Sequence, residues 1–151
     1  MPIRFFDMFA GIGGFRSGLE AVGGFECIGY CEIDPYARKA YEAIYDTRGE
    51  EYYGDATKII PEQLPDFDLI CGGFPCQSFS IAGARRGFED MRGTFFFEIA
   101  RIAAVKRPKY LYLENVPGLL NHYSGGTFKV ILNTLDDCIC LLCDQDIFCQ
   151  H

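Results

Sequence analysis

Short apolar runs of strand length alternate with segments of helical character along most of this chain. The apolar runs predict strands at residues 4–9, 25–31, 52–53, 67–71 and 110–113, and the segments between them predict helices at 15–22, 35–46 and 94–105. Gly23-Gly24 closes the first helix, and Pro35 opens the second where proline costs nothing. This alternation is typical of an α/β fold, a mostly parallel sheet with helices on both faces.

Polar or reactive residues lie at or just beyond the carboxyl ends of these expected strands. They are Asp7 with the glycines of the next turn, Glu32, Asp55, Pro75-Cys76 and Glu114-Asn115. The carboxyl ends of parallel strands meet at one edge of a sheet, and ligands bind at that edge in open α/β folds. We therefore expect one site built from five strand ends.

Length, hydrophobic content and charge indicate a globular domain without a membrane helix. The 151 residues, 49% of them hydrophobic, fit one globular domain. No apolar run approaches the roughly 20 residues of a membrane helix, and no signal peptide is recognisable, so we expect a cytoplasmic protein without a membrane partner. The net charge of −7 argues against nucleic-acid binding through bulk charge. Four aspartates without any Lys or Arg lie beyond residue 129, which weakens that objection.

The glycine turn at residues 11–14 lies between a strand and a helix, where backbone N–H groups can approach a ligand. It lacks the dinucleotide spacing G-x-G-x-x-G, and alone it is as compatible with a tight connection. Glu32 ends the next strand, where a carboxylate can bind a ribose diol. An adenosine without a diphosphate therefore fits better than NAD, and Asp55 either receives the adenine amino group or forms a turn.

Cys76 differs from the other cysteines because it lies outside a strand, between Pro75 and a polar loop. A thiol there is a nucleophile if its pKa is lowered or a base takes its proton; otherwise it is an ordinary loop cysteine. Cys27, Cys31 and Cys71 lie within apolar strands, where we expect buried small hydrophobes. Glu114 is either a proton donor facing the same pocket or a strand-terminal cap.

The motifs FDMFAGIGGF, CEIDPYA, Gly54-Asp55, GGFPCQSFS and ENVPG, in this order, resemble those of the bacterial cytosine-5 DNA methyltransferases. The resemblance implies a Rossmann-like methyltransferase fold with S-adenosylmethionine as methyl donor. It implies that Cys76 attacks cytosine C6, that Glu114 supports protonation at N3, and that Asn115 holds the cysteine loop. It also implies double-stranded DNA with a flipped cytosine as partner, in a restriction-modification system.

The same resemblance implies roles for further residues. Those expected around the cofactor are Phe9, Gly11, Ile12, Gly14, Glu32, Ile33, Asp55, Pro75 and Phe95. Those expected at DNA are Gln77, Ser80, Arg85, Arg86 and Arg92, although arginines in a polar loop are otherwise a solvated surface. A tRNA cytosine-5 methyltransferase and a catalytically silent partner subunit are the alternatives.

The family's later motifs and recognition region do not follow. We expect residues 1–135 to form the N-terminal part of the catalytic domain, incomplete at the C-terminus, and residues 136–151 to form an atypical Cys- and Asp-rich tail. A truncated or frameshifted reading frame is favoured over a split enzyme that needs a complementary C-terminal half. A zinc site from Cys140, Cys143, Cys149 and His151 ranks lowest, because its spacing matches no known finger, so no metal is expected.

Overall fold

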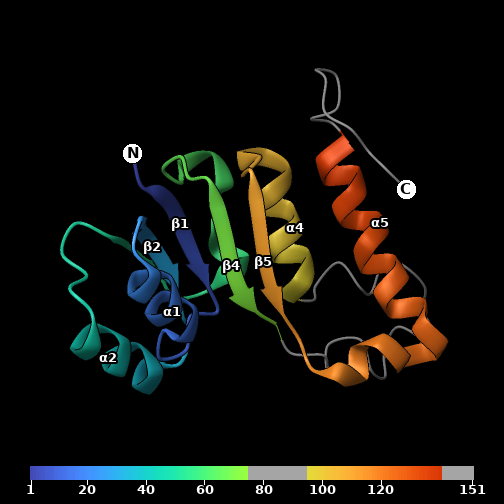
Figure 1. Cartoon of the computed structure of the whole chain (residues 1–151), viewed down its shortest axis with the longest axis horizontal. Coiled ribbons are helices and arrows are strands. Elements are labelled where there is room, and N and C mark those ends of the chain that lie inside the picture. The colour runs from blue at the N-terminus through green and yellow to red at the C-terminus, as the bar shows by residue number, and fades with distance from the viewer. Residues whose placement is uncertain (75–94, 141–151) are drawn as a thin grey trace.

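The computed structural model describes residues 1–74 and 95–140. Five parallel strands form one sheet in the order β3-β2-β1-β4-β5 (Figure 1). The strands are β1 (Ile3–Met8), β2 (Phe25–Cys31), β3 (Glu51–Tyr53), β4 (Leu69–Gly73) and β5 (Tyr110–Glu114). The α-helices are α1 (Gly14–Val22), α2 (Pro35–Ile44), α4 (Phe95–Lys106) and α5 (Gly126–Cys140). Within the described ranges, the 3₁₀ segments are η1 (Ala56–Lys58), η2 (Pro61–Gln63) and η5 (Pro117–Gly125).

The sequence pattern located every one of these strands to within two residues, and the α/β prediction is confirmed. Helix α5 was not expected. It crosses the boundary drawn at residues 135 and 136, and Phe128, Ile131, Leu135 and Cys138 pack against the main core along one face. Among the described residues, no helix is long and apolar enough to cross a membrane.

The two faces of the sheet bury different side chains, because successive residues of a strand point to opposite faces. Phe6, Met8 and Ile70 belong to the larger core, which is closed by α4 and α5. Phe5, Leu69 and Cys71 belong to a smaller cluster, covered by Phe15 and Leu19 of α1. Figure 1 shows α1 and α4 on opposite sides of the sheet. The strand sequences are apolar almost throughout for this reason.

Local chemistry fixes the beginning of α2 just after the second strand. The Asp34 carboxylate accepts hydrogen bonds from the N–H groups of Tyr36, at 2.7 Å, and Ala37, at 3.3 Å. Pro35 occupies the first helical turn, where no hydrogen bond to its nitrogen is needed. The cap turns the chain directly after Glu32 and so positions that carboxylate at the edge of the sheet.

Candidate active site

One pocket lies at the carboxyl ends of β1, β2 and β3. Five side chains that the sequence assigned to the cofactor line it together: Phe9, Glu32, Ile33, Asp55 and Phe95. Cys31, Gly54, Ala56 and Thr57 complete the lining. The expectation that separate strand ends converge on one site therefore holds for this part of the rim.

Two backbone N–H groups hold the Glu32 carboxylate in the lining of this pocket. Its Oε2 accepts the Gly11 N–H at 2.7 Å, and its Oε1 accepts the Asp34 N–H at 2.7 Å. The side chain is largely buried. A carboxylate has about four acceptor positions, so about two remain for a ligand. Two hydroxyl groups on adjacent carbons match that remaining capacity.

The side walls of the pocket are apolar. The Phe9 and Phe95 rings meet edge to face, with centroids 5.2 Å apart. Phe9 has a left-handed backbone (φ 54°), which is uncommon for an aromatic residue and is a form of strain found at binding sites. Ile33 is 70% exposed beside them. A flat aromatic base would cover this apolar surface.

Asp55 caps the N-terminal end of η1 and lines the pocket from the other side. Its Oδ1 accepts hydrogen bonds from the N–H of Thr57 at 3.0 Å and from its hydroxyl at 2.7 Å. These hydrogen bonds lower the pKa of Asp55 below its ordinary value, so the group is a carboxylate at neutral pH. Asp55 therefore forms the turn that the sequence offered as one alternative, and it also lines the pocket.

Helix α4 ties two walls of the pocket together. The Arg101 guanidinium donates to the carbonyl oxygens of Ile59 at 2.8 Å and Ala56 at 3.1 Å. The Glu98 carboxylate accepts a hydrogen bond from the same guanidinium at 2.6 Å. Because α4 begins at Phe95, this clamp joins the aromatic wall to the segment that carries Asp55.

The glycine turn supports the pocket from outside. Gly11, Ile12 and Gly14 do not line it; Gly11 contributes through its N–H to Glu32, and Gly14 begins α1. Gly13 has φ 89°, and a side chain there would overlap the Tyr45 ring at 2.3 Å. The sequence predicted that N–H groups of this turn are open to a ligand. That is wrong for two of them, because the Gly11 N–H donates to the Glu32 carboxylate and the Gly13 N–H donates to the Ala10 carbonyl oxygen.

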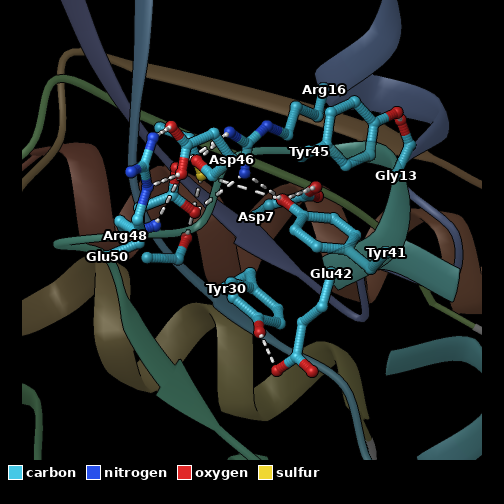
Figure 2. A network of polar contacts seen from close by, with 12 residues as sticks. Asp7, Gly13, Arg16, Tyr30, Tyr41, Glu42, Tyr45, Asp46, Arg48 and Glu50 are labelled. Carbon is cyan, nitrogen blue, oxygen red and sulfur yellow. Dashed lines mark hydrogen bonds and ion pairs between the residues drawn. The ribbon is translucent and has the colours of Figure 1, made fainter. Parts of the chain in front are cut away.

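A buried polar network holds this turn in place (Figure 2). Arg16, in the first turn of α1, donates to both carboxylate oxygens of Glu50 at 2.8 Å. The same guanidinium donates to the Tyr41 hydroxyl at 3.3 Å and to Glu20 at 2.6 Å. The sequence offered little sign of this network, because a lone arginine on a short helix is ordinarily exposed.

Asp7 lies inside the sheet rather than at its edge, so its assignment to the rim is wrong. It is fully buried and pairs in register with Tyr30 and Cys71. The Tyr41 hydroxyl donates to Asp7 Oδ2 at 3.2 Å. Burial raises the pKa of Asp7 to about 7, although the Tyr41 hydrogen bond opposes that shift. Asp7 is therefore a carboxyl group of the protein core.

A second part of the rim lies where β4 and β5 end. Gly73 pairs in register with Glu114, whose carboxylate lies against the space that a Gly73 side chain would need. The Asn115 side-chain amide donates to the carbonyl oxygen of Phe74, and its oxygen accepts the Val116 N–H at 2.9 Å. Asn115 is thus bonded to the start of the segment that leads to Cys76.

The remaining predicted residues lie outside the described part of the chain. They are Pro75, Cys76, Gln77, Ser80, Arg85, Arg86 and Arg92. The side chains of the tail residues Cys140, Cys143, Cys149 and His151 also lie outside it. The prediction for the strand cysteines is confirmed: Cys27, Cys31 and Cys71 are free and buried, and burial raises the pKa of the Cys27 and Cys31 thiols to about 12. A thiol at such a pKa is a poor nucleophile at neutral pH.

Residues 3–139 match the family model of the C-5 cytosine-specific DNA methylases. The chain belongs to this family. The resemblance seen in the sequence motifs is therefore confirmed.

The relatives cover almost all of this chain, and the chain covers a minor part of each. It is 47% identical over 135 residues to the type II methyltransferase M.HhaI of Haemophilus parahaemolyticus, which is 89% of this chain and 40% of that protein. It is 52% identical over 136 residues to the type II methyltransferase M.HpaII of Haemophilus parainfluenzae, 87% of this chain and 36% of that one. The chain thus spans less than half the length of these relatives.

Two solved structures share the fold. A DNMT2 mutant of Spodoptera frugiperda superposes with a TM-score of 0.69 at 20% identity, covering 90% of this chain and 41% of that one. The Dnmt2 methyltransferase of S. pombe superposes with a TM-score of 0.64 at 20% identity, covering 88% and 40%. The Rossmann-like methyltransferase fold predicted for this member of the family is therefore confirmed.

Proposed function

We propose that this chain is the N-terminal catalytic part of a DNA cytosine-5 methyltransferase. It transfers a methyl group from S-adenosylmethionine to C5 of a cytosine flipped out of double-stranded DNA. The names of M.HhaI and M.HpaII support a role in a type II restriction-modification system.

The arrangement of the β4 and β5 ends carries this proposal. Glu114 lies against Gly73, and Asn115 is bonded to Phe74, two residues before Cys76. An acid at the end of β5 and a thiol two residues beyond Phe74 in the sequence suit addition of sulfur to cytosine C6 while the ring gains a proton at N3. The adduct would then gain the methyl group at C5, and loss of the protons from C5 and N3 would expel the cysteine thiolate and restore the C5–C6 double bond. Cys27, Cys31 and Cys71, the cysteines within the described strands, are buried, which favours Cys76 as the reactive thiol.

The Phe9, Glu32 and Phe95 pocket fits the adenosine part of S-adenosylmethionine. Glu32 retains acceptor capacity for a ribose diol, and the apolar walls suit the faces of a purine. Ile33 packs on the adenine ring, and the Asp55 carboxylate accepts a hydrogen bond from the adenine amino group. Gly11, Ile12 and Gly14 support the cofactor from the turn beside the pocket, and Pro75 shapes the cysteine turn. When bound, the cofactor supplies an electrophilic methyl group.

We assign DNA binding to residues 75–94, which follow β4 and which the sequence predicts to form a loop. The family resemblance assigns Ser80 and Arg92 to the DNA backbone around the flipped cytosine, with Gln77 on the same segment. Arg85, Arg86 and Arg92 are proposed to meet phosphates, because arginine is well suited to phosphate recognition. Extrusion of the base is needed because C5 and C6 cannot be reached inside the stack. The rest of the enzyme, which forms the recognition region, comes from sequence corresponding to the part of M.HhaI that this chain does not span.

A methyl-transfer assay tests the proposal. The chain is co-expressed with the remaining portion of M.HpaII, and transfer of labelled methyl to DNA is measured at neutral pH. We expect Cys76→Ser to abolish transfer, whereas Cys138→Ser, a half-buried cysteine of α5, retains it. Transfer to tRNA instead of DNA, or full activity of Cys76→Ser, would contradict the proposal and favour the tRNA enzyme or the silent subunit, respectively.

A further inference from the structure

The Tyr52 side chain holds the backbone from which the Glu32 carboxylate extends. Its hydroxyl donates a hydrogen bond to the Glu32 carbonyl oxygen at 3.0 Å. The Glu32 N–H donates to the Tyr53 carbonyl oxygen, also at 3.0 Å, which continues the pairing of β2 with β3 by one residue. Both backbone groups of Glu32 are therefore bonded to β3, one through its main chain and one through a phenol.

Two neighbours fix the orientation of the Tyr52 ring. The Arg38 guanidinium lies 3.7 Å from the ring centroid, a cation–π contact. The Tyr30 ring, in register with Tyr52 on the adjacent strand, has its centroid 5.3 Å away. Glu42 joins these two neighbours, because its Oε1 accepts hydrogen bonds from Arg38 and from the Tyr30 hydroxyl, each at 2.8 Å. Figure 2 shows the bond from Tyr30. The ring is thus held from α2 and β2, which gives its hydroxyl a defined position.

Gly54 leaves room for that hydroxyl. A side chain at position 54 would come within 3.0 Å of the Tyr52 hydroxyl oxygen. The backbone of Gly54 is not left-handed, so the close approach of Tyr52, rather than backbone geometry, favours glycine at this position. The turn that leads to Asp55 therefore also accommodates the Tyr52 contact.

The peptide that Tyr52 holds joins two residues that line the cofactor pocket, Glu32 and Ile33. Tyr52 is not among the residues described as lining that pocket, so it acts on a ligand only through them. The N–H groups of Gly11 and Asp34 fix the two oxygens of the Glu32 carboxylate. A hydrogen bond to the Glu32 carbonyl oxygen restricts rotation of the following peptide, and therefore the direction of both side chains.

We propose that Tyr52 is a positioning residue for the ribose diol of S-adenosylmethionine and acts through Glu32. This inference rests on the proposed function. By holding the Glu32 carbonyl oxygen, the Tyr52 hydroxyl keeps the free acceptor positions of the carboxylate directed at the diol. Such preorganisation raises affinity, because less conformational freedom is lost when the ligand binds. The effect is confined to ligands that carry the diol.

Calorimetric titration of the chain with two ligands tests this role. The ligands are S-adenosylhomocysteine and its 2′,3′-dideoxy analogue, whose weaker binding is measured by competition with S-adenosylhomocysteine. Tyr52→Phe removes only the hydroxyl, and we expect it to weaken S-adenosylhomocysteine binding by about threefold to tenfold, the contribution of one hydrogen bond. Binding of the dideoxy analogue should equal that of wild type. Tyr30→Phe is the matched control, because its hydroxyl bonds Glu42 on α2, and it should change the affinity for neither ligand.

The outcomes separate positioning from general stability and from the proposed function. A loss for S-adenosylhomocysteine alone, in Tyr52→Phe but not in Tyr30→Phe, supports the role. Equal losses for the two ligands, equal losses in the two variants, or no loss at all overturn it and leave the cofactor assignment intact. Failure of the wild-type chain to bind S-adenosylhomocysteine overturns the cofactor assignment and, with it, the role of Tyr52.

Discussion

The Tyr45 hydroxyl donates a hydrogen bond to the Gly13 carbonyl oxygen at 2.7 Å, and its ring fills the space that a side chain at position 13 would need. Gly13 also has φ 89°, which L-residues rarely adopt. We expect Gly13→Ala to lower the free energy of unfolding by about 2 to 4 kcal/mol, from backbone strain and steric overlap together. Urea unfolding measures it.

Gly11 provides the matched control for that substitution. It too has positive φ, at 56°, but a side chain there meets nothing within 4 Å. Gly11→Ala should therefore cost only the backbone strain, about 1 kcal/mol. In a Tyr45→Ala background, the cost of Gly13→Ala should fall to about the same value. Equal costs of Gly13→Ala with and without the Tyr45 ring would show that the overlap is unimportant.

The ion pair between Arg16 and Glu50 is buried, whereas that between Arg48 and Asp46 is exposed. Glu50→Gln leaves the Arg16 charge without its main partner in the interior, and we expect a loss of about 3 kcal/mol of stability. Arg48→Gln should have little effect, because solvent screens its pair. Chemical denaturation measures the free energy of unfolding of both variants. A loss for Glu50→Gln no larger than that for Arg48→Gln would mean that the network is not a support for the turn.

The sequence predicted the elements and one side of the site because both follow local rules. Apolar runs and glycine turns located the strands, and the polar residues that end them, such as Glu32 and Glu114, lie at the expected edge. Asp7 was misplaced because a carboxyl group inside a strand is stabilised by Tyr41 and Cys71, which lie far away in sequence. Arg16 was missed for the same reason: its partner Glu50 is 34 residues away.

Helix α5 could have been predicted. Phe128, Ile131, Leu135 and Cys138 recur at helical spacing and pack on one core. The cysteines and aspartates after residue 135 instead favoured the interpretation of an atypical tail. The spacing of apolar residues was the better guide to structure there.

Asp7 makes the stability of the chain depend on pH. Its pKa is raised from 3.8 to about 7 in the folded state, so the folded chain holds a proton that the unfolded chain has lost. The contribution of Asp7 is full below pH 4 and falls as pH rises toward 7, by on the order of 2 to 4 kcal/mol. Asp7→Asn should remove this dependence. Identical pH profiles for wild type and Asp7→Asn, measured by urea unfolding between pH 4 and 8, would contradict the assignment.

Arg101 should act on the cofactor pocket through η1. Arg101→Gln removes the clamp on the Ala56 and Ile59 carbonyl groups, and we expect affinity for S-adenosylhomocysteine to fall by about fivefold to tenfold. Lys106→Gln is the control, because Lys106 lies on the same helix and bonds the Leu64 carbonyl group, outside the pocket. Calorimetric titration of both variants measures the effect. Arg101→Lys should recover part of the affinity, and an equal loss in Lys106→Gln would indicate general destabilisation.

Covalent trapping tests the central claim most directly. The chain, co-expressed with the remaining portion of M.HpaII, is incubated with S-adenosylmethionine and DNA that contains 5-fluorocytosine, and the adduct is mapped by peptide mass spectrometry. Fluorine at C5 cannot leave as a proton does, so the covalent complex accumulates. We predict a DNA adduct on Cys76, absent in Cys76→Ser and formed more slowly in Glu114→Gln. An adduct on another cysteine, or none in a complex that binds cofactor and DNA, would contradict the account.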